Sequence, residues 1–322
     1  MRIAILTSGG DAPGMNAAIR AVVRAGSQRN WDVVGVLEGF RGLMAGDFQP
    51  LDSRAVGGIM QLGGTMLRSA RAPEFSGAVG QEAALQQLAQ RNIDGLVVVG
   101  GNGSQRGSLA LSRLGFPVVG LASTIDNDLW GVDVSLGVDT ALNVVLESLD
   151  RIRSTASSHG RIFLVEVMGR DCGYLALNAG IAGGAEIIAI PETDSDELDL
   201  MVELRDAFDR KGYAVGVVAE GWRGGAAGLA KAFTEAQLDD NAPRVRLTIL
   251  GHVQRGGTPT YADRMLGTRL GAAAVACLAH GEHGVLLGLH EGRLRALTLE
   301  QVGSRKKDLD AELLLIAQTL QD

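Results

Sequence analysis

Short apolar runs rich in β-branched residues alternate with longer amphipathic stretches along most of this chain. Eight of the apolar runs are expected to be strands, at residues 3–7, 33–37, 96–99, 117–121, 162–167, 186–190, 214–219 and 247–250. Helical periodicity marks the amphipathic stretches, among them residues 15–27, 82–90, 140–157 and 197–211. This alternation predicts βαβ units and a parallel sheet with helices on both faces.

The spacing of the expected strands favours an open, doubly wound α/β fold over a closed barrel. The spacing is irregular, and glycine-rich turns follow only some of the strands. The first four strands end before residue 138 and the next four end near residue 250, which divides the chain into two Rossmann-like halves. Such halves bind ligands at the carboxyl ends of their strands, so we expect them to face a cleft. Residues 309–320 predict a terminal helix that docks on one half.

Composition excludes several classes of function. The 30 Lys and Arg residues against 37 Asp and Glu give a formal charge of −7, which does not suit a nucleic-acid partner. All four lysines follow residue 210, which excludes a Walker P-loop and the protein-kinase lysine from the N-terminal half. No run approaches the ~18 apolar residues of a membrane span. With only two cysteines, Cys172 and Cys277, we expect a cytoplasmic protein in a reducing compartment, without membrane contact.

Two glycine-rich loops follow expected strands and precede expected helices. Residues 7–16 read TSGGDAPGMN and residues 99–104 read VGGNGS. Backbone amides at a glycine-rich helix start form an anion site, so two such loops on neighbouring strands could hold one polyphosphate. Neither loop has the spacing of the dinucleotide-binding fingerprint, and each alone is also compatible with a simple tight turn.

Carboxylates and arginines complete the candidate chemistry. Asp126 and Asp128 follow the fourth expected strand, where one could act as a general base and the other lie near a cation. The same pattern is also typical of an Asx-rich turn. Arginines stand beside flexible backbone in residues 68–71, 168–173 and 251–257. Their guanidinium groups suit a phosphorylated substrate or a phosphoryl transition state, although a single arginine is usually a solvated surface residue.

Together these motifs resemble the phosphofructokinase family, specifically its bacterial-type ATP-dependent 6-phosphofructokinases. The resemblance covers nearly the whole chain, through residues 8–24, 63–75, 100–104, 124–128, 159–173, 191–192, 219–221 and 251–264. It implies the phosphorylation of fructose 6-phosphate by ATP with Mg²⁺, at the 1-hydroxyl, to fructose 1,6-bisphosphate in glycolysis. It also implies a homo-oligomer, usually a tetramer, with shared active sites. The implied domains are a nucleotide-binding one, residues 1–138 and 251–304, and a sugar-phosphate-binding one, residues 139–250 and 305–322.

The resemblance also implies a role for each motif residue. Asp126 would be the base, oriented with Thr124, while charge on the phosphoryl group would be stabilised by Arg71 and Arg170, with Asp128 nearby. Nucleotide contacts would be Gly10, Phe40, Arg71, Ala72, Gly101, Asn102, Gly103 and Ser104. Substrate contacts would be Thr124, Asp126, Met168, Gly169, Arg170, Glu220, His252 and Arg255, with Arg161 and Arg246 from a neighbouring subunit. An effector pocket between subunits would use Arg20, Arg24, Arg153, Glu186 and Lys211.

This chain departs from the family pattern at several positions. Asn102 stands where the family has an aspartate that helps hold Mg²⁺. An amide oxygen can ligate the metal but supplies no charge, so we expect weaker metal binding and slow turnover. Gly103 matches the ATP-dependent enzymes. Ser123 matches neither the glycine of the ATP-dependent enzymes nor the lysine of the pyrophosphate-dependent ones, and the absence of that lysine favours ATP. Regulation is expected to be altered or weak, because relatives carry charged residues at the positions of Ser53, Gly58, Gly212 and Tyr213.

Two other functions stay open on the sequence. Asn102 is also compatible with a catalytically attenuated, regulatory paralogue that binds sugar phosphate or nucleotide and co-assembles with an active subunit. A kinase with another phosphoryl donor or another phosphosugar would carry the same motifs. The stereochemistry of the sugar is selected by the positions of side chains, which the sequence does not give.

Overall fold

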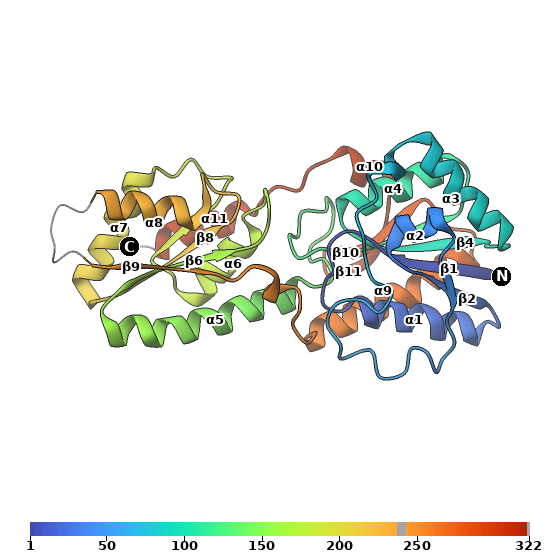
Figure 1. The fold of residues 1–322 in the computed structure, drawn as a ribbon, viewed down its shortest axis with the longest axis horizontal. Coiled ribbons are helices and arrows are strands. Elements are labelled where there is room, and N and C mark those ends of the chain that lie inside the picture. Colours follow the sequence, from blue (N-terminus) through green and yellow to red (C-terminus); the bar gives the residue numbers. More distant parts are fainter. Residues whose placement is uncertain (237–242, 321–322) are drawn as a thin grey trace. The chain divides into compact units, whose positions relative to one another are not determined.

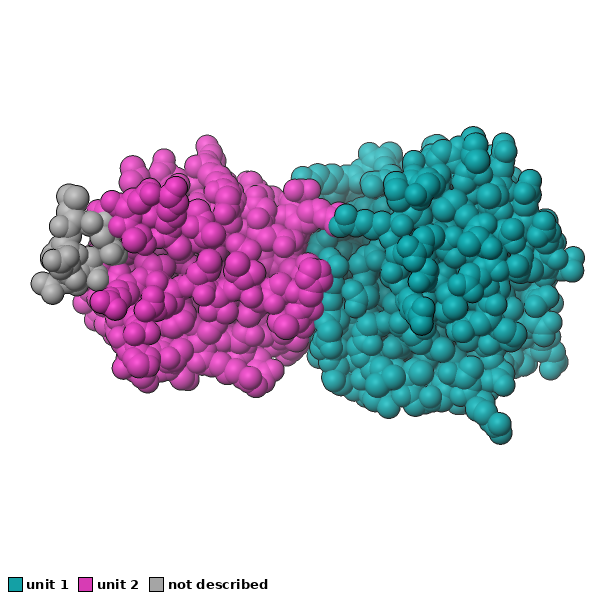
Figure 2. All heavy atoms as spheres, in the orientation of Figure 1, with its two compact units in different colours: residues 1–140, 255–307 teal, residues 141–254, 308–322 magenta. Residues whose placement is uncertain are grey.

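The computed structural model describes residues 1–236 and 243–320 and divides the chain into two compact units. Unit 1 comprises residues 1–140 and 255–307, and unit 2 comprises residues 141–254 and 308–322 (Figure 2). Each unit has a sheet of its own with helices packed on it, which confirms the predicted α/β class.

Unit 1 is built on a seven-stranded sheet in the order β11-β10-β5-β4-β1-β2-β3. Its strands are β1 (Arg2–Thr7), β2 (Asp32–Val36), β3 (Phe48–Pro50), β4 (Gly95–Gly100), β5 (Val118–Ala122), β10 (Val285–His290) and β11 (Arg293–Thr298). The five central strands are parallel, and the edge strands β3 and β11 run antiparallel to their neighbours. The sheet is therefore mixed rather than purely parallel as predicted.

Helices cover both faces of this sheet (Figure 1). One face carries α1 (Met15–Gln28) and α9 (Tyr261–Ala279), and the other carries α2 (Gly39–Ala45), α3 (Ala78–Gln90) and α4 (Asn102–Arg113). Glycine lets α9 approach α1 closely, because a Cβ on Gly271 would lie 2.5 Å from the carbonyl oxygen of Ala18. The short helices η1 (Pro73–Ser76) and α10 (Leu299–Ser304) pack against α3 and α4 respectively.

Unit 2 has four parallel strands in the order β7-β8-β6-β9. They are β6 (Ile162–Val167), β7 (Ile187–Ala189), β8 (Ala214–Ala219) and β9 (Val245–Ile249). One face buries the apolar side of α7 (Glu197–Lys211) and α8 (Gly225–Glu235). On the other side of β7, α6 (Tyr174–Gly183) packs through Gly180 against Ile188, and α5 (Val138–His159) contacts α6. The terminal helix α11 (Ala311–Leu320) docks on α6, as predicted for the tail.

All eight predicted strands are present, but β3, β10 and β11 were not predicted. The hairpin of β10 and β11 turns through Glu291 and Gly292, both with positive φ (52° and 69°). Such a two-residue turn matches the twist of a hairpin, so this Glu-Gly step after an apolar run was a usable signal. The three residues of β3 are too few to show any periodicity. No helix within the described residues has the length and apolar character that a membrane crossing needs.

Asp263, a buried carboxylate in α9, ties this helix to the start of α5 within unit 1. Its two oxygens accept from the backbone of Gly137 (2.7 Å) and from the backbone and hydroxyl of Thr140 (2.8 and 2.5 Å). We expect Asp263→Asn to lower the free energy of unfolding by about 2 kcal/mol, because the amide turns a donor toward these donors. The melting temperature should fall by ~4–8 °C. The exposed Asp209→Asn, which loses only an ion pair with Arg205, should change little.

The carboxyl group of Asp263 should also make the stability of the fold depend on pH. Burial raises the pKa of Asp263, and the three donors offset this only in part. The folded chain then binds this proton more tightly than the unfolded chain, so stability falls as the pH rises from the ordinary carboxyl pKa through the raised one. Asp263→Asn should lose that slope in a melting series across acidic pH. An unchanged slope and an unchanged melting temperature would contradict the assignment.

Candidate active site

Three loops at the carboxyl ends of β1, β4 and β5 lie side by side in unit 1. The Ser8 amide donates to the Val99 carbonyl (3.0 Å), which joins the first glycine-rich loop to β4. The Ser123 amide donates to the Gly100 carbonyl (3.2 Å), which joins the second glycine-rich loop to the loop after β5. The two glycine-rich loops and the segment of Asp126 and Asp128 therefore form one site at this edge of the sheet.

Glycine is required where these loops approach each other. A Cβ on Gly100 would lie 2.5 Å from Ser104 Oγ and 2.6 Å from the Ser8 carbonyl oxygen. A Cβ on Gly101 would lie 3.2 Å from the Cβ of Thr124. The first turn of α4 begins at Asn102 and thus presents its unpaired backbone amides beside Thr124. Such a helix start with close backbone approach suits a phosphate group.

Residues 68–71, a polar segment with two arginines, are hydrogen-bonded to the first glycine-rich loop. Thr7 Oγ1 donates to the Arg68 carbonyl (2.9 Å), and Ser69 Oγ donates to the Gly9 carbonyl (2.5 Å). Arg71 lies two residues after Ser69, and its side chain is exposed. A cationic side chain therefore stands next to the loops that suit phosphate.

Arg255 lies against the same loop. A Cβ on Gly10 would lie 2.8 Å from Nη1 and 2.9 Å from Cζ of Arg255, so the guanidinium covers Gly10. Its buried Nε has no hydrogen-bond partner in the described structure. The sequence predicted Arg255 as a sugar-phosphate contact, and the structure places it beside a predicted nucleotide contact. A guanidinium at this position with an unused donor suits an anionic ligand.

The loop after β5 holds its two carboxylates on either side of a fixed asparagine. The Asp126 amide donates to Thr124 Oγ1 (3.1 Å), so Thr124 shapes the turn that carries Asp126. Asn127 is buried and has φ 51°; its side chain accepts from the Ser135 amide and donates to the Asp133 carbonyl, both at 3.0 Å. Asp126 and Asp128 are each half-buried, which leaves them reachable by a ligand.

The oxygen groups around Asn102 bear on metal binding. Asn102 Nδ2 donates to the Asp128 carbonyl (3.3 Å), which leaves its amide oxygen to act as a ligand near Asp128. Over residues 1–236 and 243–320, no group of three or more His, Cys, Asp or Glu side chains could hold a metal. Mg²⁺ is usually bound by one or two carboxylates together with substrate phosphates. The amide oxygen of Asn102 and the carboxylate of Asp128 therefore fit a Mg²⁺ ion that binds together with the phosphates of a nucleotide.

Phe40 is a core residue in this structure. Its side chain is 4% exposed, its ring stacks on Phe75 with centroids 4.1 Å apart, and a Cβ on Gly107 would lie 2.7 Å from its ring. Ala72, another predicted nucleotide contact, packs against the same core cluster. A contact of Phe40 with an adenine ring stays a prediction.

In unit 2, predicted substrate residues gather at the carboxyl ends of β6, β8 and β9. The Arg170 amide donates to Glu220 Oε1 (2.7 Å), and the Met168 amide donates to Gln254 Oε1 (3.3 Å). Gly169 and Arg170 both have positive φ (140° and 53°), so the backbone turns sharply and leaves the Arg170 side chain exposed. His252 is exposed on the short helix η2 (Gly251–Gln254) that follows β9.

Arg161 and Arg246 lie apart from this cluster. Arg161 immediately precedes β6, and Arg246 on β9 pairs with Phe163 near the amino end of β6. Met168 follows five residues after Phe163, which at ~3.3 Å per residue corresponds to about 16 Å along the strand. Within one chain these two arginines are therefore separated from the other predicted substrate residues of unit 2.

Comparison with known proteins shows the family of this chain. The family model described as Phosphofructokinase matches residues 2–278. This chain belongs to the phosphofructokinase family. ATP-dependent 6-phosphofructokinase 1 of Thermus thermophilus is 49% identical over 99% of both chains. The ATP-dependent 6-phosphofructokinase of Listeria welshimeri is 47% identical, again over 99% of both.

Solved phosphofructokinase structures share the fold. The Saccharomyces cerevisiae phosphofructokinase superposes with a TM-score of 0.85 at 38% identity, over 94% of this chain and 45% of that longer one. A pyrophosphate-dependent phosphofructokinase from Marinobacter aquaeolei superposes with a TM-score of 0.88 over 99% of this chain and 91% of its own, at 19% identity. The latter likeness shows the fold alone.

Three of the predicted effector residues of this phosphofructokinase-family chain come together in unit 2. Lys211 Nζ lies 2.5 Å from Glu186 Oε1, and Arg153 donates to the carbonyl of Gly184 (2.6 Å). The side chain of Glu186 is almost fully buried, and Lys211 balances the charge of its carboxylate. The remaining two, Arg20 and Arg24, lie on α1 of unit 1.

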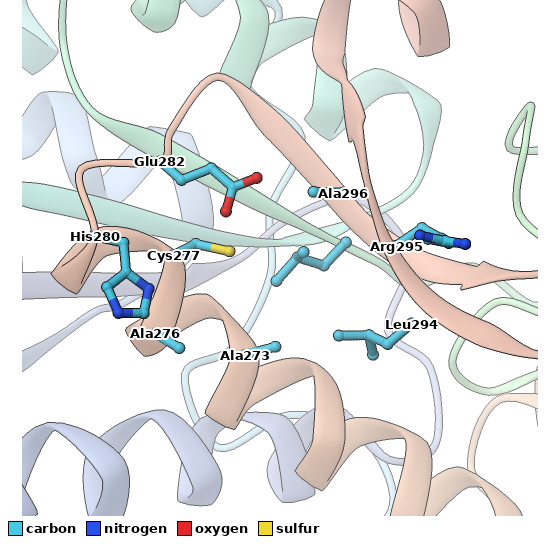
Figure 3. A pocket seen from close by; sticks show the side chains of 9 residues that line it. Ala273, Ala276, Cys277, His280, Glu282, Leu294, Arg295 and Ala296 are labelled. Carbon is cyan, nitrogen blue, oxygen red and sulfur yellow. The ribbon is translucent and has the colours of Figure 1, made fainter.

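A hollow of about 450 Å³ lies elsewhere in unit 1, between α9 and the β10–β11 hairpin (Figure 3). Its lining includes Cys277, His280, Glu282 and Arg295 and none of the predicted site residues. Burial and the neighbouring Glu282 raise the pKa of the Cys277 thiol to about 11, so this cysteine is a poor nucleophile. Both cysteines are buried.

One residue that supports the second glycine-rich loop, Gln105, was not predicted from the sequence. Gln105 is buried, and its Nε2 donates to the carbonyls of Gly100 (2.9 Å) and Leu121 (3.3 Å). It therefore ties β4 to β5 just behind the site. The signal was its three-residue spacing from Ser108 and Leu111, which together form the buried face of α4.

Proposed function

We propose that this chain transfers the γ-phosphoryl group of ATP to the 1-hydroxyl of fructose 6-phosphate, giving fructose 1,6-bisphosphate and ADP. The observation that carries the proposal is the meeting of two glycine-rich loops, the start of α4 and the Asp126 loop at one sheet edge. The relatives named ATP-dependent 6-phosphofructokinase support the donor and the acceptor. Glycolysis and a cytoplasmic location belong to the same proposal.

The mechanism uses the groups that converge in unit 1, together with Arg170 of unit 2. Asp126 takes the proton of the 1-hydroxyl as its oxygen attacks the γ-phosphorus and the bond to ADP breaks. The amides at the start of α4, with Arg71 and Arg170, stabilise the charge on the phosphoryl group during transfer. Mg²⁺ bound with ATP would be held by Asn102 and Asp128 and would neutralise phosphate charge. Positioning and electrostatics supply nearly all of the catalysis in such a reaction.

We assign the nucleotide to unit 1 and the sugar phosphate to unit 2. Unit 1 carries the glycine-rich loops, while unit 2 carries the exposed Arg170 and His252 beside Glu220. Arg255, which the family resemblance assigns to the sugar phosphate, belongs to unit 1, where its guanidinium covers Gly10. The cleft between the two halves stays a prediction.

We further propose a homo-oligomer, a tetramer as in the family, in which a neighbouring copy completes the substrate site. Arg161 and Arg246 lie at the far end of their strands from Met168, which is understandable if they serve the site of another copy. Arg246 lies on β9, and Arg161 precedes the neighbouring strand β6. β9 is an edge strand whose Leu247 and Ile249 are 39% and 57% exposed. An apolar sheet edge of this kind is typical of an interface.

For the effector pocket we propose altered or weak regulation by an anionic effector. Glu186 is paired with Lys211, and glycine at position 58 supplies no second carboxylate for a metal. Arg20, Arg24 and Arg153 could still bind an anion there.

A second candidate function is the binding of sugar phosphate or nucleotide with little turnover. It is favoured by the Asn102 amide, which bonds to the Asp128 carbonyl where the family has a charged metal ligand. Such a chain would act as a regulatory subunit that retains its phosphate site.

The choice of donor can be tested at Gly103. A Cβ there would have only Arg106 Nη2 nearby, at 4.0 Å, so aspartate fits without moving the backbone. We expect the wild type to use ATP and not pyrophosphate. Gly103→Asp should raise the KM for ATP by at least about tenfold, because its carboxylate repels a phosphate at the start of α4; tenfold corresponds to ~1.4 kcal/mol.

Gly103→Asn is the matched control, because it adds nearly the same volume without the charge. Its KM for ATP should stay within about threefold of that of the wild type, and both variants should keep the wild-type melting temperature. Turnover of the wild type with pyrophosphate, or an unchanged KM in Gly103→Asp, would contradict the proposed donor.

A further inference from the structure

The loop that carries Asp126 and Asp128 has no helix or extended strand of its own. We call residues 123–136 the carboxylate loop; it is closed at its neck by an isolated bridge between Ser123 and Leu136. Leu136 also donates its amide to the Ala122 carbonyl (3.0 Å). Beyond this neck, the shape of the loop depends on contacts that its residues make with other parts of unit 1.

The far side of the carboxylate loop is fastened to the β10–β11 hairpin. The Asp133 amide donates to the Leu289 carbonyl, and Asp133 Oδ2 accepts from the Gly292 amide, both at 2.8 Å. Leu129 and Val132 are fully buried in a small core cluster with Leu286 of the hairpin. The hairpin therefore holds the far side of the loop, through residues 129–133 that follow the two carboxylates.

A second fastening comes from residues 305–307, the last segment of unit 1 before the chain passes to unit 2. Lys307 Nζ donates to the carbonyls of Val132 (2.6 Å) and Asp133 (2.9 Å). Arg305 lies over the ring of Trp130, with its Cζ 4.3 Å from the ring centroid. Two cationic side chains that are two positions apart in the sequence, Arg305 and Lys307, thus contact one loop.

The carbonyl of Asp133 connects Lys307 to the carboxylates. It accepts from Lys307 Nζ (2.9 Å) and also from the side chain of Asn127 (3.0 Å). Asn127 stands between Asp126 and Asp128 and has φ 51°, a conformation that needs support in a residue other than glycine. Lys307 therefore donates to the same Asp133 carbonyl that holds the side chain of Asn127 in this conformation.

We propose that Lys307 is a positioning residue for the phosphoryl transfer. It fixes the Asp133 carbonyl, this carbonyl fixes Asn127, and Asn127 fixes the direction of the carboxylates on either side of it. The inference rests on the proposed function, because it assigns to Asp126 the role of base. A base displaced by a fraction of an ångström loses rate while the bound substrates keep their contacts.

The test compares three purified full-length variants with the wild type. Lys307→Met keeps the apolar stem and removes the donors, Lys306→Met changes the neighbouring exposed lysine, and Lys307→Arg restores donors at the same position. We expect Lys307→Met to lower kcat by about tenfold, with both KM values within about threefold and the melting temperature nearly unchanged. Lys306→Met should match the wild type, and Lys307→Arg should recover most of the rate.

Hydrogen exchange measured without substrates gives a readout that does not depend on activity. Amides of the carboxylate loop, in particular Ser135, should exchange about tenfold faster in Lys307→Met than in Lys306→Met, while β1 stays unchanged. If Lys307→Met does not yield folded protein, Lys307→Gln, which keeps one donor group, takes its place in both measurements.

Equal rates and equal exchange in the two methionine variants would overturn the inference. So would a loss of kcat that comes with a lower melting temperature and faster exchange throughout unit 1, because Lys307 would then be only structural. A wild type without turnover would overturn the proposed function instead, and the positioning role for the reaction with it. The exchange comparison would still decide whether Lys307 orders the loop.

Discussion

Asp126→Asn is expected to lower kcat for the phosphorylation of fructose 6-phosphate by about 10³-fold. The amide cannot accept the proton of the 1-hydroxyl, although it fills the same space in the turn shaped by Thr124. Both KM values should stay within a few-fold, because the glycine-rich loops and arginines that suit phosphate are unchanged. A coupled assay of ADP release under saturating MgATP measures the effect directly.

Asp32→Asn is a suitable control for this substitution. Asp32 is exposed at the start of β2, at the edge of the sheet opposite the candidate site. The control should keep the wild-type kcat, and both variants should keep the wild-type melting temperature. An Asp126→Asn variant that retains more than a tenth of the wild-type kcat would show that another group removes the proton.

Asn102→Asp is expected to raise kcat at saturating Mg²⁺ by about 100-fold, the lower end of the scale of one well-placed electrostatic group. A carboxylate adds a charged ligand beside Asp128 where the amide has none. The same change replaces a hydrogen bond to the Asp128 carbonyl by repulsion, so its benefit should appear only with metal. The melting temperature of the variant should therefore rise more than that of the wild type when Mg²⁺ and ATP are added.

Titrations of kcat with Mg²⁺ and with Mn²⁺, at fixed ATP, measure this effect in the two proteins in parallel. Asn102→Ala is the control that removes the amide without adding charge, and it should be slower than the wild type. Negligible wild-type turnover that the aspartate restores would identify an attenuated paralogue. An Asn102→Asp variant with the rate and metal dependence of the wild type would place Asn102 outside the metal environment.

The central strands and the glycine-rich loops could be predicted from the sequence because both depend on local patterns. Apolar runs such as residues 95–100 read as buried parallel strands, and the loops that follow them consist of residues with special backbone requirements. Parallel strands then bring the loops to one edge, so the convergence of Gly10, Gly100 and Asp126 follows from the fold class itself.

Contacts between distant segments could not be predicted in the same way. Phe40 is buried against Phe75, and nothing in the pattern around it distinguishes a core aromatic from an exposed one. Lys307 lies in a basic run that looks like a solvated surface, yet it contacts carbonyls 175 and 174 residues earlier. Only tertiary structure brings such residues together.

The proposed phosphoryl transfer is observed directly by ³¹P NMR of the wild type with fructose 6-phosphate, ATP and Mg²⁺. We expect a second phosphomonoester signal on carbon 1 of the sugar to grow in step with ADP, and to be absent in Asp126→Asn. If ATP is not consumed, or if ADP forms without a sugar bisphosphate, the proposed phosphoryl transfer is wrong.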